Sequence, residues 1–125
     1  MIFLIVFKWR KWKNVKRNDF EKSIRVLYRQ CARWAAAALQ DESEMIALLH
    51  ANYAAGYLWS IKDIVSSNEF EEITGVEFLE FENKIVEIQD QATKRMIKKC
   101  PDLIFIKDKI LLAAMYSREY NQSND

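Results

Sequence analysis

Glycine and proline are scarce in this sequence, which has 2 Gly and 1 Pro in 125 residues. An all-β fold needs many more turn residues of these two types, which argues against sandwiches and barrels. Half of the residues are hydrophobic and 30% are charged, a balance that argues against a disordered chain. The composition therefore predicts a compact helical protein, long enough to bury a substantial core in one domain.

Cysteine and histidine are also scarce, with 2 Cys and 1 His. Neither Cys31 nor Cys100 has a second cysteine or a histidine close to it in the sequence, so free thiols are favoured over a disulfide or a zinc site. Free thiols indicate a reducing compartment, and we expect a cytoplasmic protein. His50 follows Ala47 by three residues, which argues against the Glu-x-x-His pairs of di-metal helical bundles. We expect no cofactor.

Motifs for nucleophilic catalysis and for phosphate binding are missing as well. The sequence has no glycine-rich nucleophile elbow and no P-loop, and a lone histidine depends on the fold to meet a nucleophile. The sequence therefore favours a protein that is not an enzyme.

Apolar runs are short, and the one at residues 1–7, MIFLIVF, falls well below the roughly 20 residues that cross a bilayer. Its positive charges follow it, in KWRKWKNVKR, whereas a secretory signal carries them before the apolar run. We expect neither a transmembrane segment nor a standard signal peptide.

The net charge of +1 conceals an uneven distribution along the chain. Residues 1–33 carry 10 Lys/Arg against 2 Asp/Glu, and the other residues carry 9 against 16. The sequence therefore predicts a basic arm on an acidic body. The basic surface candidates are Lys8, Arg10, Lys11, Lys13, Arg25, Arg29 and Arg33.

Residues 1–17 form an apolar and basic extension that has several interpretations. They could dock on the body as a β-like or helical piece, or bind nucleic acid. They could also anchor the chain at a membrane, with Trp9 and Trp12 at the lipid headgroups and lysines on the phosphates. A further alternative is an extension translated from a misassigned start, with no role.

Residues 18–117 are expected to form a single helical domain, followed by a frayed tail over 118–125. Apolar residues four and three apart predict a helix over 18–39, capped by Asn18 or Asp19. These apolar residues are Phe20, Ile24, Leu27, Cys31, Trp34 and Ala38. Asp41 and Glu44 resemble a capping box that begins a second helix, which would run to about residue 65. A single long helix through residue 41 remains an alternative.

Thr74 and Glu77 repeat the capping-box pattern before a third helix, after a polar connection SSNEF. Its predicted apolar stripe consists of Phe78, Phe81, Ile85, Ile88, Ala92 and Met96. Pro101 ends that helix and suits the first turn of a fourth over residues 102–116. Four helices with short connections predict an all-α, antiparallel up-and-down bundle.

Small residues of the first two helices would face each other in an antiparallel pair, for example Ala35 and Ala36 opposite Ala47. Such contacts let two helices approach closely. Gly56 costs about 1 kcal/mol in a helix interior, so we expect an aromatic side chain, Trp34 or Tyr28, to approach it closely.

Residues 47–59, ALLHANYAAGYLW, contain the polar candidates for a ligand site or an interface: His50, Asn52, Tyr53 and Tyr57. A hydrogen-bonded strip in the core or at an interface is the plainer interpretation, because buried polar groups need partners. A ligand pocket, or catalysis with His50 as general base, are the alternatives.

Two acidic pairs match the ExxE and ExxD spacing of all-α nucleotide pyrophosphohydrolases, whose carboxylates bind Mg²⁺. The pairs are Glu69 with Glu72 and Glu87 with Asp90. A solvated acidic surface explains the same spacing, so the metal site is the third hypothesis.

The run RQCARWAAAALQDESEMIALLHANYAAGYLW resembles small uncharacterised proteins encoded by marine viruses and environmental metagenomes. The resemblance covers about a quarter of the chain and implies a small intracellular accessory protein, without assigned chemistry or site residues. The leading hypothesis is self-association, or binding of a partner protein, through an aromatic and alanine-rich helix surface. Nucleic acid or an anionic membrane, bound by the basic arm, is the alternative partner.

Overall fold

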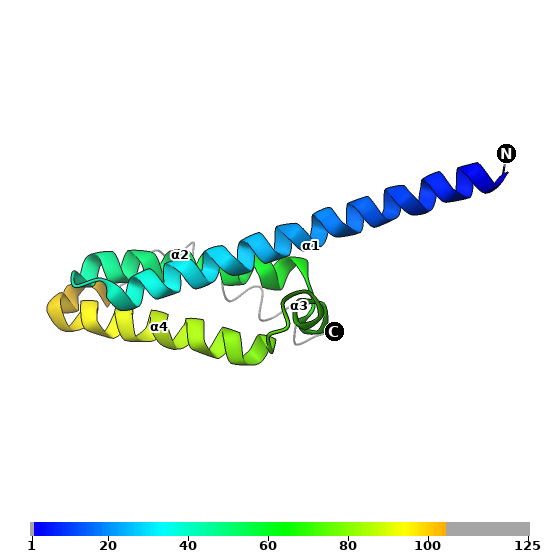
Figure 1. Ribbon diagram of the computed structural model, residues 1–125. Coiled ribbons are helices and arrows are strands. Elements are labelled where there is room, and N and C mark those ends of the chain that lie inside the picture. The colour runs from blue at the N-terminus through cyan, green and yellow to red at the C-terminus, as the bar shows by residue number, and fades with distance from the viewer. Residues whose placement is uncertain (1, 105–125) are drawn as a thin grey trace, which may run out of the picture.

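The computed structural model describes residues 2–104, and within them the protein is all-α. The elements are α1 (Ile2–Gln40), α2 (Glu44–Ile64), α3 (Ser67–Thr74), α4 (Phe78–Lys99) and a short 3-10 helix η1 (Pro101–Ile104). Successive long helices run antiparallel, with α2 packed on both α1 and α4, while one half of α1 extends far beyond the bundle (Figure 1). The prediction of an all-α antiparallel bundle is confirmed.

Helix α1 is much longer than the sequence pattern predicted. It begins at Ile2, so Asn18 and Asp19 lie inside the helix and cap nothing. The predicted start at residue 18 is therefore wrong, because the preceding residues contain no glycine or proline to end a helix. With 39 residues, α1 is about 58 Å long.

The connection between α1 and α2 breaks the helix near the predicted position, but with another cap. Ser43 is the N-cap, and its Oγ accepts a hydrogen bond from the Ile46 backbone N–H at 3.5 Å. The capping role predicted for Asp41 is wrong, and so is the alternative of a single helix through residue 41. Asp41 instead contacts His50, which lies in the second turn of α2.

The predicted polar connection after α2 is a helix, α3. Ser66 caps it by accepting from the Glu69 N–H at 3.2 Å, and Gly75 ends it with a φ of 74°, a conformation that favours glycine. The predicted Thr74–Glu77 capping box is wrong. Glu77 makes no side-chain cap bond, and the Phe78 N–H donates to Glu71 Oε1 at 3.2 Å.

Beyond α4, only the start of the fourth predicted helix can be compared with the structure. Residues 101–104 form η1, and the rest of the segment 102–116 lies outside the described residues, as does the tail 118–125. Among residues 2–104, the helix that brings the number of α-helices to four is α3, which the sequence pattern did not predict.

The core combines the two predicted stripes with one ring from α3. Ile24 and Cys31 of α1 and Ile85 and Ile88 of α4 are buried, and Phe20, Leu27, Trp34 and Phe81 pack partly buried against them. Phe70 of α3 has no exposed surface. Its ring lies edge-on to Tyr28 at 5.5 Å and to Phe78 at 5.1 Å between ring centres. Phe70 therefore holds α3 against both α1 and α4.

Alanines and one cysteine fill the contact between α1 and α2. Ala35 of α1 and Ala47, Ala51 and Ala54 of α2 are buried, which confirms close packing through small residues. Cys31 Sγ donates to the Ala54 carbonyl oxygen at 3.2 Å, so the side chain of one helix reaches the backbone of the other. Ala36 is exposed, and its predicted place opposite Ala47 is wrong.

Candidate functional site

The first candidate site is the N-terminal arm, defined here as residues 2–17 of α1. It projects from the bundle as a continuous helix (Figure 1), and every one of its side chains is exposed. Its first part is apolar on all sides, and Phe3 is 91% exposed. The exposed apolar side chains of the N-terminal arm are Ile2, Phe3, Leu4, Ile5, Val6, Phe7, Trp9, Trp12 and Val15.

Two tryptophans and a set of cations follow the apolar residues along the N-terminal arm. The Lys13 ammonium lies 3.8 Å from the centre of the Trp9 ring, and the Lys16 ammonium lies 4.3 Å from that of Trp12. Such cation–π contacts hold an ammonium beside an indole ring on one helix face. Lys8, Arg10 and Lys11 are exposed on the same turns. The arm has no acidic residue.

The N-terminal arm joins the bundle at Arg17. Its Nε lies 3.3 Å from Glu21 of α1, and its Nη1 lies 3.7 Å from Glu69 of α3. Among residues 2–104, Arg17 is the first basic residue along the chain that forms an ion pair. The cations at positions 8–16 therefore keep their charge available to an external anion.

The basic residues of α1 within the bundle form a separate surface. Arg25 pairs with Glu21 of its own helix at 3.3 Å, and Arg29 and Arg33 are exposed. Arg25 and Arg29 border a shallow depression of about 400 Å³ beside Thr74. The positive charge of this surface is separated from that of the N-terminal arm, because Glu21 and Glu69 lie between them, beside Arg17.

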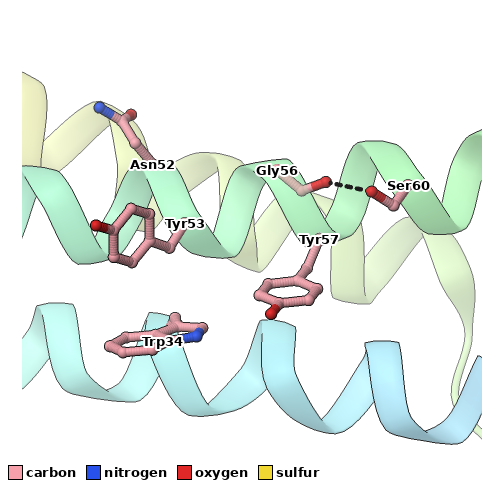
Figure 2. Close-up of a pocket in the computed structure, with 6 residues that line it drawn as sticks. All are labelled: Trp34, Asn52, Tyr53, Gly56, Tyr57 and Ser60. Carbon is pink, nitrogen blue, oxygen red and sulfur yellow. Dashed lines mark hydrogen bonds between the residues drawn. The ribbon is translucent and has the colours of Figure 1, made fainter.

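The second candidate site is the aromatic groove, an open depression of about 550 Å³ between α1 and α2. Its lining residues are Trp34, Asn52, Tyr53, Gly56, Tyr57 and Ser60. In Figure 2 the rings of Tyr53 and Tyr57 project from α2 towards α1, where the Trp34 ring lies beneath Tyr53. The Trp34 and Tyr53 rings meet edge-on, with their centres 5.2 Å apart.

Gly56 and Ser60 form the small-residue edge of the aromatic groove. Ser60 Oγ donates to the Gly56 carbonyl oxygen at 2.9 Å, which turns the hydroxyl back onto its own helix (Figure 2). A Cβ on Gly56 would meet no atom within 4 Å. The predicted close approach of Trp34 or Tyr28 to this glycine is therefore wrong, and Gly56 keeps the groove open.

The structure places three of the four polar candidates of α2 at the aromatic groove and turns the fourth, His50, towards Asp41. His50 Nδ1 contacts Asp41 Oδ2 at 2.6 Å, and its ring lies 4.9 Å from Trp34 and 6.1 Å from Tyr53. Tyr53 and Tyr57 line the aromatic groove with Asn52. Asn52 also accepts a hydrogen bond from Gln89 of α4 at 3.0 Å, so it faces the opposite neighbour of α2. Among the described residues, His50 and Tyr53 are the only two of these four candidates whose rings pack against each other.

The four carboxylates of the metal hypothesis lie on two helices, Glu69 and Glu72 on α3 and Glu87 and Asp90 on α4. Among residues 2–104, no three His, Cys, Asp or Glu side chains are grouped so that they could hold a metal ion. Glu69 faces Arg17, and Glu87 accepts a hydrogen bond from Gln91 at 3.2 Å. In this part of the chain the ExxE and ExxD spacing therefore does not bring three such side chains together.

Three residues of these sites were not recognised as such in the sequence. Trp59 is 58% exposed on α2, Trp34 is part of the aromatic groove as well as of the core, and Asp41 is the partner of His50. A signal for Trp59 existed: α2 has no Asp, Glu, Lys or Arg between Glu44 and Lys62, so one side of an apolar helix had to face solvent.

Comparison of the chain with protein-family models, with curated proteins and with solved structures finds no match. In the part of the chain that the structure describes, no helix combines the length and apolar character needed to cross a bilayer. Function must therefore be argued from the N-terminal arm and the aromatic groove themselves.

Proposed function

We propose that this protein binds the surface of anionic lipid membranes through its N-terminal arm. The observation that carries the proposal is the exposed helix from Ile2 to Phe7, apolar on every side, directly followed by exposed tryptophans and cations. In this arrangement the N-terminal arm lies at the membrane and anchors the acidic bundle to it.

The apolar part of the N-terminal arm fits a bilayer better than a protein groove. Successive helix residues point about 100° apart, so six apolar residues in a row cover the whole circumference of the helix. A groove on a partner protein covers one side of a helix, whereas lipid chains surround it. Residues 2–7 extend about 9 Å, against about 30 Å of hydrocarbon in a bilayer, so they suit insertion into one leaflet.

The residues after Phe7 suit the headgroup region. Tryptophan is enriched where the hydrocarbon meets water, and lysine side chains extend towards the phosphates while their stems stay on the apolar surface. Trp9 and Trp12, each with a lysine beside the ring, follow Phe7 by two and five residues, which places both within about one and a half turns of the apolar residues. The five unpaired cations of the N-terminal arm each contribute about 1 kcal/mol at an anionic surface.

The charge of the body orients the molecule. Residues 18–104, which form the bundle, carry 10 Lys/Arg against 15 Asp/Glu, so an anionic surface repels the bundle while it attracts the N-terminal arm. Since α1 is one continuous helix, the arm and the bundle are joined without a hinge. The bundle is therefore held away from the lipid surface. The N-terminal arm binds the cytoplasmic leaflet, where anionic lipids are concentrated.

Co-sedimentation of the full-length protein with vesicles tests this proposal. We expect binding to vesicles of phosphatidylcholine with 30% phosphatidylserine, with weaker binding to pure phosphatidylcholine and in high salt. The double variant Phe3→Ser/Phe7→Ser should bind at least about tenfold more weakly, because each buried phenylalanine contributes roughly 1.5–3 kcal/mol. The variant Lys8→Gln/Lys11→Gln/Lys13→Gln should lose the dependence on anionic lipid.

A matched control uses basic residues of the same helix inside the bundle. The variant Lys22→Gln/Arg25→Gln/Arg29→Gln removes the same charge outside the N-terminal arm, and its vesicle binding should stay within twofold of the parent. A duplex DNA of 20 base pairs is the competing ligand. If the Phe3/Phe7 variant binds vesicles as the parent does, or if DNA binds more tightly than anionic vesicles and releases the protein from them, the membrane proposal is wrong.

A further inference from the structure

The cationic part of the N-terminal arm has two different sides. One side carries the two tryptophans, whose rings contact the ammonium groups of Lys13 and Lys16. The other side carries a shallow depression of about 400 Å³, which we call the arm depression. Lys11 of this depression lies about 140° around the helix from Lys16, because successive residues are about 100° apart. The residues that line the arm depression are Phe7, Arg10, Lys11, Asn14, Val15 and Asn18.

The distribution of side chains around the N-terminal arm suits entry into a bilayer end-on. Residues 2–7 are apolar on every side, and the cations at positions 8–16 also point in all directions, so neither part has one side for lipid and one for water. Because α1 is one continuous helix (Figure 1), an arm lying flat would also press the acidic bundle against the anionic surface. An end-on arm avoids both conflicts.

In this orientation the residues of the arm depression lie at successive depths of the membrane surface. Arg10 and Lys11 lie about 4.5 and 6 Å beyond Phe7 along the helix, and Asn14 lies about 10.5 Å beyond it. The headgroup region is roughly 5–7 Å thick on each side of the hydrocarbon. With Phe7 at the edge of the hydrocarbon, the two cations therefore reach the phosphates, and Asn14 lies just outside them.

The cations of the arm depression select among headgroups. The guanidinium of Arg10 can bind two oxygens of a phosphate at once, and Lys11 adds a second positive charge beside it. Choline, ethanolamine and serine headgroups all carry an ammonium group beyond the phosphate, and these two cations repel it. An anionic headgroup without an ammonium group therefore fits the arm depression better.

The outer end of the arm depression suits hydroxyl groups. Asn14 and Asn18 are exposed and four residues apart, so they are neighbours on one line of the helix. An amide side chain both donates and accepts hydrogen bonds, as a hydroxyl does. Val15, 51% exposed, lies beside both amides and offers an apolar contact. A ring with hydroxyls at its edge and C–H groups on its faces matches this combination, whereas a glycerol headgroup has no ring and only two hydroxyls.

We infer that the arm depression binds the headgroup of an anionic lipid whose phosphate carries an inositol ring. Arg10 and Lys11 hold the phosphate, and Asn14 and Asn18 bond to the ring hydroxyls. The inference rests on the proposed membrane binding and names the lipid that the N-terminal arm selects.

Co-sedimentation of the full-length protein with three kinds of vesicle tests this selection. Each contains phosphatidylcholine with 30% of phosphatidylinositol, phosphatidylserine or phosphatidylglycerol, lipids that each carry one negative charge. We expect the parent to bind the phosphatidylinositol vesicles at least about fivefold more tightly than either of the others, because the amides add hydrogen bonds only there. In Asn14→Ala/Asn18→Ala this preference should fall below about twofold, while alanine keeps the arm helical.

Two variants that remove the same charge from opposite sides of the arm provide the matched control. Arg10→Gln/Lys11→Gln should reduce the preference for phosphatidylinositol to below about twofold. Lys13→Gln/Lys16→Gln should weaken binding to all three anionic vesicles alike and keep the fivefold preference. The inference is wrong if the parent binds phosphatidylinositol vesicles within twofold of either other anionic vesicle, or if the preference survives the loss of both asparagines. Those outcomes leave the membrane proposal intact, whereas a parent that binds no anionic vesicle contradicts that proposal itself.

Discussion

His50 Nδ1 of α2 lies 2.6 Å from Oδ2 of Asp41, which directly follows α1. The pair joins the start of the α1–α2 connection to the second turn of α2, and the Trp34 ring lies 4.9 Å from the imidazole. Both side chains are 22% exposed, so water screens the contact only in part. The only histidine of the chain therefore has a structural role, in which it holds α2 against residue 41.

We predict that Asp41→Asn and His50→Ala each lower the free energy of unfolding by about 1 kcal/mol, the usual loss for one such hydrogen bond. Urea unfolding followed by circular dichroism measures the change. In the double variant the losses should not add, because both substitutions remove the same bond. Asp63→Asn, an exposed residue near the end of α2, is the control. Additive losses from Asp41 and His50 would show that the two side chains stabilise the fold independently.

Burial raises the pKa of the Cys31 thiol to about 12, since the thiolate would lose its hydration in the core. At pH 8 the thiol therefore stays protonated, and it also lies against the Ala54 carbonyl oxygen. We predict that a maleimide labels Cys100, which is exposed, and leaves Cys31 unlabelled. Mass spectrometry should find one label per native chain and two in 6 M guanidinium chloride. Rapid labelling of both cysteines in the native protein would contradict the close α1–α2 packing.

The pKa of Glu44 is lowered, first by its hydrogen bond to Lys99. The two groups meet at 2.9 Å between Glu44 Oε2 and Lys99 Nζ, which joins the first turn of α2 to the last of α4. A carboxyl whose pKa is lower in the folded state stabilises the fold above its unfolded value. That contribution is lost as pH falls from about 4.5 through the folded pKa.

We therefore predict that Glu44→Gln destabilises the protein at pH 7 but has little effect at pH 3. The measurement is the midpoint of urea unfolding at several pH values between 7 and 3. Glu72→Gln, at an exposed position of α3, provides a charge-matched control. An equal effect of Glu44→Gln at pH 7 and pH 3 would rule out the ion pair as the cause.

The two glycines should respond to alanine in opposite directions. Gly56→Ala should raise the free energy of unfolding by about 1 kcal/mol, because the helix gains propensity and the new Cβ meets no atom within 4 Å. Gly75→Ala should lower it by about 1 kcal/mol, because its φ of 74° is unfavourable for alanine. Urea unfolding followed by circular dichroism measures both changes.

The faces of α1 and α4 could be predicted from the sequence, because a helix repeats every 3.6 residues and its buried side follows from that spacing alone. Every member of the two predicted stripes is buried or partly buried, from Phe20 to Ala38 and from Phe78 to Met96. Scarce glycine and proline likewise determined the all-α class. These are local properties, which do not depend on residues that are distant in the sequence.

Helix α3, the Asp41–His50 pair and the aromatic groove depend on contacts between residues that are distant in the sequence. Helix α3 has only eight residues and polar flanks, and it is held in place by the burial of Phe70 among rings from α1 and α4. Asp41 resembled a helix cap until the fold brought His50 to it, and the aromatic groove exists only where Trp34 of α1 meets α2. By itself the sequence determined which residues are apolar and which helix faces they share. Only the tertiary structure decided which of these faces are covered, because burial depends on the neighbours that the folded chain supplies.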